Sequence, residues 1–228
     1  MRVLVFDTET TGLPTERNAS IFDTHKWPHV VQLSYIVYDT LQQTVVHWAD
    51  DLVQVGRDVL ITPESIAIHG LTPERCQLEG RPLVDLLKAF HAAVLGADLL
   101  VGHNLAFDKQ MLMVECNRLK VMQPFTLGGV RKPEFCTMKK LTQACQLTAV
   151  NKTTGETYPK YPTLTELHQH FFHCKPTVVH DALADVVICL RCYLAAEHPG
   201  QVLQTNLETL RKGMDPPRIK NEGQLHSQ

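Results

Sequence analysis

The chain has 228 residues, of which 44% are hydrophobic and 20% charged, and its formal net charge is −2 at pH 7. This composition is ordinary for a globular domain, and the charge argues against a protein that coats duplex nucleic acid, although a small nucleic-acid site stays open. No apolar run approaches the roughly 20 residues of a membrane span, and Asp7 interrupts the N-terminus too early for a signal peptide. We therefore expect one intracellular domain, cytoplasmic or nuclear, without a membrane partner.

The seven cysteines are odd in number and scattered, as expected of reduced thiols that lie mostly in the core. Only Cys189 and Cys192 lie close together, and without a second ligand pair they do not indicate a zinc site. Basic residues outnumber acidic ones between 120 and 160, which fits either a solvated face or a patch that contacts phosphates.

The first part of the chain predicts three strands followed by short helices. Residues 2–6 form an apolar run suited to a strand covered on both faces, and residues 30–39 and 43–53 are β-rich segments that predict a hairpin. Thr62 and Thr72 each precede Pro-Glu, the pattern of an N-cap followed by proline in the first helical position.

Strands and helices alternate in the remainder of the chain. The hydrophobic pattern predicts short strands and helices, with polar loops between them. The expected strands lie at 98–104 and from 134; the helices at 82–96, 104–119, from 137, 163–172, 182–196 and, more weakly, 201–212; the loops at 121–133 and 148–162. A hairpin followed by strand–helix units predicts an α/β fold with a mixed, partly parallel sheet. We expect a domain over 1–198, and over 199–228 a helix and a partly mobile tail.

Four carboxylates stand out because each needs a partner. Asp7 and Glu9 end the first strand and, being two residues apart, point to the same face, where they repel each other unless a cation binds. Asp108 lies in the first turns of a helix that follows a strand end, where α/β sheets place ligand-binding groups. Asp185 sits among mostly apolar helical neighbours, where an unpaired charge costs several kcal/mol.

Three of the four acids also have an ordinary structural explanation, whereas Asp185 has none. A turn acid explains Asp7 or Glu9 taken singly, and the helix dipole explains Asp108 equally well. If the four acids converge, however, an all-oxygen set suits Mg²⁺ or Mn²⁺ better than zinc. His180 then lies beside the site as a base, whereas a lone histidine would be a surface or capping residue. For Asp181 we favour a structural role, as N-cap of the last long helix.

The segments FDTETTG, HNLAFD and HDALAD resemble, in order and type, the three motifs of the DEDDh (DnaQ-like) 3′-to-5′ exonucleases. This family includes the polymerase III epsilon proofreading subunit, the TREX nucleases and RNase T. The segment IAIHGLTPE (66–74) also resembles the HGIT-type segment before the second motif. The resemblance covers roughly residues 3–195 and implies an RNase H-like fold, a five-stranded mixed sheet flanked by helices.

The resemblance implies that Asp7, Glu9 and Asp185 hold the catalytic metal, that Asp7 also contacts a second metal, and that Asp108 holds this second ion largely through water. His180 would be the general base. Two divalent cations, Mg²⁺ or Mn²⁺, would then assist hydrolysis of the phosphodiester to 5′-mononucleotides.

The resemblance also points to residues that meet the terminal nucleotide: Thr10, Thr11, Gly12, Leu13, His69, Asn104 and Phe107. Backbone N–H groups near Thr10 would contact sugar and phosphate, and Leu13 would pack on the base. Asn104 either binds substrate or caps its helix, and Phe107 is expected in the core rather than stacked on a base. His103 is expected to support the strand end.

Three connections, 14–29, 121–133 and 148–162, are longer than in compact family members, and long loops beside a site usually set substrate choice. We therefore expect a metal-dependent 3′-to-5′ exonuclease for single-stranded or frayed 3′ ends, with DNA only weakly favoured over RNA. The alternative from another class is a non-catalytic binding or scaffold subunit associated with a polymerase. An endonuclease of the same fold is disfavoured by the order of the motifs.

Overall fold

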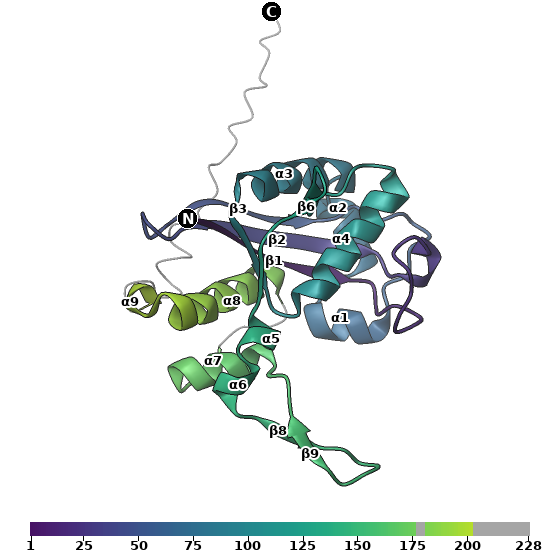
Figure 1. Ribbon diagram of the computed structural model, residues 1–228. Helices are drawn as coiled ribbons and strands as arrows, with labels where there is room; N and C mark the ends of the chain where they lie inside the picture. Colours follow the sequence, from purple (N-terminus) through teal and green to yellow (C-terminus); the bar gives the residue numbers. More distant parts are fainter. Residues whose placement is uncertain (177–180, 203–228) are drawn as a thin grey trace, which may run out of the picture.

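A five-stranded mixed sheet forms the centre of the computed structural model, which describes residues 1–176 and 181–202 (Figure 1). The strands, in spatial order, are β3 (Thr44–Leu52), β2 (Val30–Asp39), β1 (Arg2–Thr10), β4 (Leu99–Gly102) and β7 (Glu134–Cys136). β1, β2 and β3 pair antiparallel, whereas β4 and β7 run parallel to β1. The α/β class and the five-stranded mixed sheet are thus confirmed.

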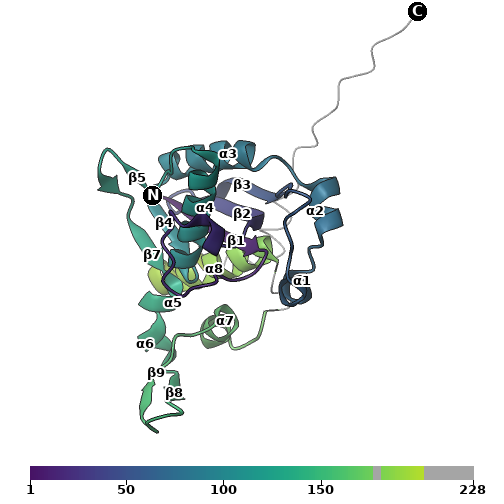
Figure 2. The ribbon, with the colours of Figure 1, turned by 90° about the vertical axis from the view of Figure 1, so that its right-hand side faces the viewer.

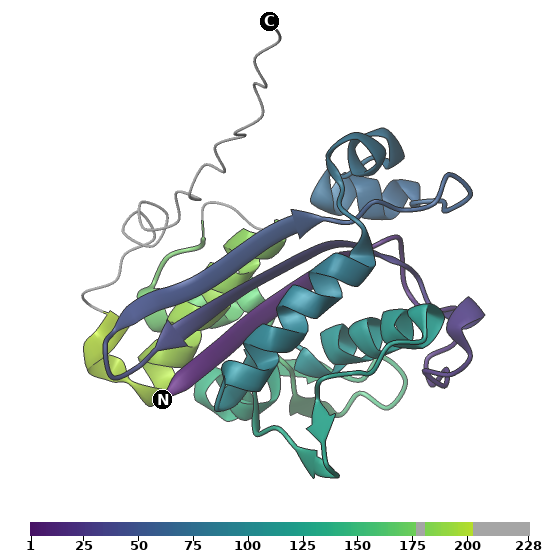
Figure 3. The same ribbon diagram turned by 90° about the horizontal axis from the view of Figure 1, so that it is seen from above.

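Helices cover both faces of this sheet, as Figure 3 shows from above. Leu4 and Phe6 of β1 pack against α3 (Leu83–Gly96) and α4 (Leu105–Leu119), whereas Val3 and Val5 pack against α8 (Ala182–Glu197); all four side chains are buried. Side chains of a strand alternate between faces, so an unbroken apolar run is what a sheet covered on both sides requires.

Shorter helices surround this core, and their ends follow the capping residues of the sequence. The side chains of Thr62 and Thr72 cap α1 and α2 by accepting hydrogen bonds from backbone N–H groups. Thr163 begins α7 with a capping box. The remaining helical elements are η1 (Thr24–Lys26), α1 (Pro63–His69), α2 (Pro73–Glu79), α5 (Thr137–Lys140), α6 (Thr142–Cys145), α7 (Leu164–Phe172) and α9 (Pro199–Val202). These N-caps were predicted correctly.

The two polar loops predicted at 121–133 and 148–162 are wrong in part, because each contains a small hairpin. The first consists of β5 (Thr126–Leu127) and β6 (Val130–Arg131), the second of β8 (Thr148–Val150) and β9 (Thr157–Pro159). Both turns contain glycine with positive φ. In these short strands glycine in the turn, and not the hydrophobic pattern, is the sequence signal for a hairpin. In Figures 1 and 2 the β8–β9 hairpin projects away from the sheet.

Two boundaries also differ from the prediction. β1 continues to Thr10, well past the apolar run, and the helix expected from Thr137 breaks into α5 and α6 at Leu141. Of the weak helix expected at 201–212, only the first two residues are described, and they belong to α9. All seven cysteines are free thiols, and Cys76, Cys116, Cys189 and Cys192 are buried. Among the described residues, no helix combines the length and the apolarity needed to cross a membrane.

Candidate metal site

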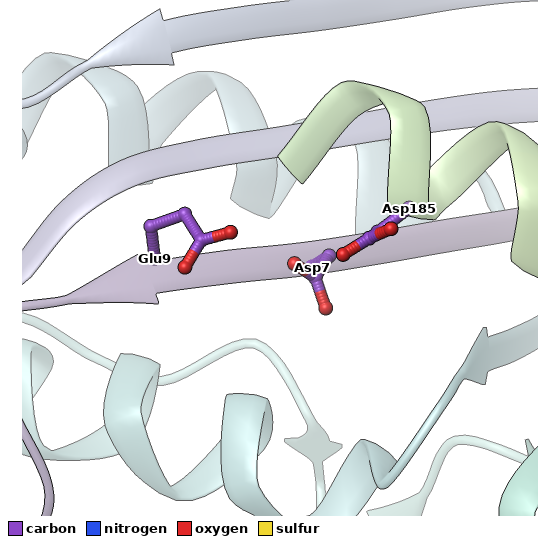
Figure 4. A group of neighbouring side chains, drawn as sticks. All are labelled: Asp7, Glu9 and Asp185. Carbon is purple, nitrogen blue, oxygen red and sulfur yellow. The ribbon is translucent and has the colours of Figure 1, made fainter. Parts of the chain in front are cut away.

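Three of the predicted acids come together at the end of β1. One carboxylate oxygen from each of Asp7, Glu9 and Asp185 lies within 4.8 Å of the others. Asp7 and Glu9 are two residues apart on β1, so both point to the face covered by α8. Asp185 belongs to the first turn of that helix. Figure 4 shows the three side chains together on this side of the strand.

The site lies where β1 extends beyond the shorter strand β4. β2 accompanies β1 as far as Thr10, whereas the pairing with β4 ends at Val5 and β4 itself ends at Gly102. The last residues of β1 therefore extend beyond the carboxyl end of its parallel neighbour. This is the edge where open α/β sheets bind ligands.

Asp108, in the first turn of α4, occupies the edge of β1 that β4 leaves open. Its Oδ1 atom accepts a hydrogen bond from the backbone N–H of Thr8 at 3.1 Å and another from the Thr8 hydroxyl at 2.7 Å. The side chain is buried, with 3% of the residue exposed. The acid thus replaces the carbonyl that a longer β4 would have supplied, which satisfies a buried N–H group.

The carboxyl groups of Asp7, Glu9 and Asp108 all have a raised pKa. Burial raises the pKa of Asp7 well above its usual range, and the charges of Asp108, Glu9 and Asp185 add to the effect. Burial followed by the charge of Asp185 raises the pKa of Glu9 to about 7. Burial also raises the pKa of Asp108 to about 7, although the two hydrogen bonds from Thr8 oppose it.

The site carries more negative charge than its surroundings balance. Within the described part of the chain, no lysine, arginine or histidine forms an ion pair with Asp7, Glu9 or Asp108. Without a cation the crowded carboxyl groups retain protons, whereas a divalent ion would relieve both the repulsion and the cost of burial. The donors are all oxygens, so the residues fit Mg²⁺ or Mn²⁺.

Asp181, at the start of α8, has a structural role. The side chain of Asp181 accepts a hydrogen bond from the N–H of Ala184 at 2.9 Å, which confirms its predicted role as N-cap. His180, the predicted general base, lies outside the described residues.

The segment after β1 is held by backbone hydrogen bonds. The N–H of Thr11 donates to the carbonyl of His29, and the carbonyl of Thr11 accepts from the N–H of Thr62. The N–H of His29 in turn donates to the Thr11 hydroxyl. The amide of Thr11 is therefore occupied. Thr10 is 8% exposed, and its hydroxyl donates to the carbonyl of Gly12. The remaining candidates of this segment for contacting a nucleotide are Gly12 and Leu13, and Leu13 is 80% exposed.

His69 braces the same segment. Leu71 N–H donates to Nδ1 of His69 at 3.0 Å, and Nε2 lies 3.2 Å from the carbonyl oxygen of Thr10. Because Nδ1 accepts, Nε2 carries the proton and donates to Thr10. Burial lowers the pKa of His69, which favours this neutral form. Both ring nitrogens are used within the protein, so His69 supports the strand end.

His103 likewise supports the end of β4. Its Nε2 lies 3.1 Å from the carbonyl oxygen of Pro162, and its Nδ1 lies 3.0 Å from the hydroxyl of Thr137. Burial lowers the pKa of His103 to about 4, so the ring is neutral, donates to Pro162 and accepts from Thr137. It connects β4, α5 and the segment that follows the β8–β9 hairpin, as the sequence predicted for the strand end.

Asn104 and Phe107, two predicted substrate contacts, have different surroundings. Asn104 stands at the N-cap position of α4, but its backbone is left-handed (φ 62°), its side chain makes no capping hydrogen bond, and the residue is exposed. The alternative that it caps the helix is thus not supported. Phe107 is half-buried and packs against a core cluster that includes Trp27 and Met111, which favours its interpretation as a core residue.

Thr8 is the residue that the sequence interpretation missed. It lies between Asp7 and Glu9 and therefore points to the opposite face of β1, toward the side covered by α4. A hydroxyl at that position, facing a helix whose first turn carries an acid, was the available signal.

Comparison with known proteins agrees with this arrangement. Residues 4–193 match the RNase T family of exonucleases. Escherichia coli exonuclease I with a dA16 oligonucleotide has a similar structure (TM-score 0.60, 16% identity, 95% of this chain and 46% of that chain). The zinc-bound form of the E. coli exonuclease I complex with single-stranded DNA has a TM-score of 0.62 and 18% identity, over 95% of this chain and 46% of that chain. Exonuclease I from Methylocaldum szegediense has a TM-score of 0.56 and 18% identity, over 88% of this chain and 42% of that chain.

The chain spans less than half the length of these solved proteins. At such identities the likeness shows the fold, which is the predicted RNase H-like fold. No curated protein sequence matches the chain.

Proposed function

Since the chain belongs to this family of exonucleases, we propose that it is a divalent-metal-dependent 3′-to-5′ exonuclease. It removes nucleotides from single-stranded or frayed 3′ ends and releases 5′-mononucleotides, and the domain that does so extends over residues 1–198. The observation that carries the proposal is the convergence of Asp7, Glu9 and Asp185, with Asp108 close enough to raise the pKa of Asp7.

Asp7, Glu9 and Asp185 would hold the catalytic ion, and Asp7 and Asp108 a second one. When bound, Mg²⁺ or Mn²⁺ supplies a water of lowered pKa and stabilises the leaving 3′ oxygen. The burial of Asp108 and the raised pKa of Asp7 support this assignment, because a carboxylate that is costly to ionise alone can release its proton when a hard cation binds to it.

The chain's own groups then orient the substrate and accept a proton. His180 accepts the proton of the attacking water, as a histidine next to a metal site does best when its pKa lies near the working pH. Gly12 and Leu13 contact the terminal nucleotide, and the exposed amide of Asn104 donates a hydrogen bond to it. DNA is the favoured substrate, because the similar exonuclease I structures contain single-stranded oligonucleotides such as dA16.

The test uses single-stranded DNA and RNA labelled at either end, with Mn²⁺, the wild type and Asp7→Asn. We expect the wild type to shorten 5′-labelled strands stepwise and to release the label of 3′-labelled strands as a mononucleotide at once. Relative rates then choose between DNA and RNA. Cleavage of a closed single-stranded circle would overturn the exonuclease assignment, and no nucleotide release from any substrate would favour the scaffold alternative.

A further inference from the structure

Thr8 makes two hydrogen bonds to a single oxygen of a predicted metal ligand. Its backbone N–H and its hydroxyl both donate to Oδ1 of Asp108, at 3.1 and 2.7 Å. Both residues are buried, with 6% of Thr8 and 3% of Asp108 exposed, so water does not compete for these bonds. The carboxylate is therefore held at a fixed position and in a fixed orientation.

The backbone bond and the side-chain bond have different purposes. Any residue other than proline at position 8 would supply the N–H group, which needs an acceptor because the pairing of β4 with β1 ends at Val5. The hydroxyl, by contrast, depends on the side chain. It adds no sheet pairing and acts only on the orientation of Asp108.

We propose that Thr8 is a positioning residue, whose hydroxyl fixes the Asp108 carboxylate by Oδ1 and so orients it toward the second divalent ion that it would hold, directly or through water. This inference rests on the proposed function of the site. Hydrogen bonds to metal-binding carboxylates orient the ligand, and their loss typically lowers metal affinity or activity by about 10- to 100-fold. Thr8 therefore sets the affinity for the ion, while the chemical step at saturating metal is unaffected.

The decisive variant is Thr8→Val, which keeps the shape of the side chain and removes only the hydroxyl. Thr8→Ser retains the hydroxyl and serves as the conservative rescue. Thr142→Val is the matched control, because Thr142 is also buried and its hydroxyl donates to the carbonyl of Met138 in a different part of the fold. If Thr8→Val does not fold, Thr8→Ala takes its place.

Mn²⁺ binding to the protein alone is measured by calorimetry, and nucleotide release is measured against Mn²⁺ concentration. We expect Thr8→Val to weaken Mn²⁺ binding about tenfold, with kcat at saturating Mn²⁺ within about twofold of wild type. Thr8→Ser and Thr142→Val should bind Mn²⁺ like the wild type.

Wild-type Mn²⁺ affinity in Thr8→Val would overturn the inference, since the hydroxyl would then only stabilise the strand edge. A loss of kcat at saturating Mn²⁺ with unchanged affinity would also overturn it, because the hydroxyl would act in the chemical step. If the wild type itself binds no Mn²⁺, the proposed function fails first, and this result is distinct from the other two.

Discussion

Helix α4 carries two buried acids about two turns apart, and they have opposite surroundings. Glu115 is 2% exposed and Asp108 is 3% exposed. Glu115 has a cation, since Arg118 approaches it to 2.7 Å, and it also accepts a hydrogen bond from the N–H of Val30 at 3.1 Å. Asp108 instead has the hydrogen bonds of Thr8 and lies among other carboxylates.

The surroundings of Glu115 serve the fold. Arg118 also donates to the backbone carbonyls of Thr24, Trp27 and Pro28 at 2.6, 2.6 and 2.8 Å. One ion pair thus fixes the long connection 14–29 against α4, and every charge in it has a partner. Burial alone therefore does not identify a functional acid. A buried acid paired with arginine is structural, whereas one that faces other acids needs an external cation.

The strongest test of this distinction removes Asp7, for which the described residues supply no cation. Asp7→Asn should lower the rate of nucleotide release by about 10³-fold or more, because a bound ion contributes several kcal/mol to stabilising the transition state. The thermal unfolding temperature in metal-free buffer should not fall, since asparagine has the shape of the protonated acid and lacks the ionised form that burial and the neighbouring acids disfavour. The rate is measured with 5′-labelled single-stranded DNA. A variant that retains a tenth of the wild-type rate would place the essential ion elsewhere.

Substituting the two acids of α4 in parallel tests the comparison directly. Glu115→Gln should lower the unfolding temperature by about 6 °C or more, because breaking a buried ion pair costs about 3–5 kcal/mol. Its activity per folded molecule should stay near wild type. Asp108→Asn should lose about 100-fold in activity and keep its unfolding temperature, since Asn still accepts both bonds from Thr8. Melting curves and initial rates at one pH suffice, and an exchange of the two phenotypes would refute the distinction.

Part of the acid cluster was visible in the sequence, whereas the pairing of Glu115 with Arg118 was not. The shared face of Asp7 and Glu9 follows from side-chain alternation along a strand, which is a local property. Asp185 joins them from α8, and its part in the cluster was expected only on condition that the acids converge. The caps of Thr62, Thr72 and Asp181 are local as well and were predicted for the same reason.

What the sequence did not show depends on contacts between distant segments. Thr8 and Asp108 are 100 positions apart, and the 85 positions between Val30 and Glu115 separate another buried pair. The two small hairpins were missed because their strands have only two or three residues, too few for a period-two pattern to be recognised. The occupied amide of Thr11 likewise follows from the return of the chain at His29.

A third prediction concerns pH and separates the acid cluster from the rest of the fold. In metal-free protein, folding raises the pKa of Glu9 from 4.5 and that of Asp108 from 3.8, in both cases to about 7. The folded state therefore binds more protons than the unfolded state within this window, so these groups lose their stabilising contribution as the pH rises toward 7. A divalent ion restores it by replacing the protons.

The stabilisation by saturating Mg²⁺ should accordingly grow between pH 5.5 and 7.5 by about 2 kcal/mol, or about 4–8 °C in unfolding temperature. Half-buried histidines such as His103, whose pKa is lowered, affect the pH dependence in the opposite sense. Their contribution is the same with and without Mg²⁺ and therefore cancels. The difference between paired melting curves is the measured quantity. A stabilisation that is constant over this range would mean that the ion displaces no protons from these acids.

The smallest expected effect concerns Asn104, which stands at the N-cap position of α4, the helix that carries Asp108. Asn104→Gly suits the left-handed backbone, so the unfolding free energy should change by no more than about 1 kcal/mol. Loss of a hydrogen bond to the substrate should raise KM about fivefold and leave kcat nearly unchanged. Steady-state kinetics on a short single strand measures both. An unchanged KM would remove Asn104 from the substrate site.

The most direct test of the metal assignment is calorimetric titration of Mn²⁺ into wild type, Asp108→Asn and Glu115→Gln at pH 7.5. The wild type and Glu115→Gln should bind Mn²⁺ with the same stoichiometry and affinity, whereas Asp108→Asn should lose one ion or bind it far more weakly. Equal binding by Asp108→Asn, or weakened binding by Glu115→Gln, would contradict the assignment of the metal to Asp108 and the acids around it.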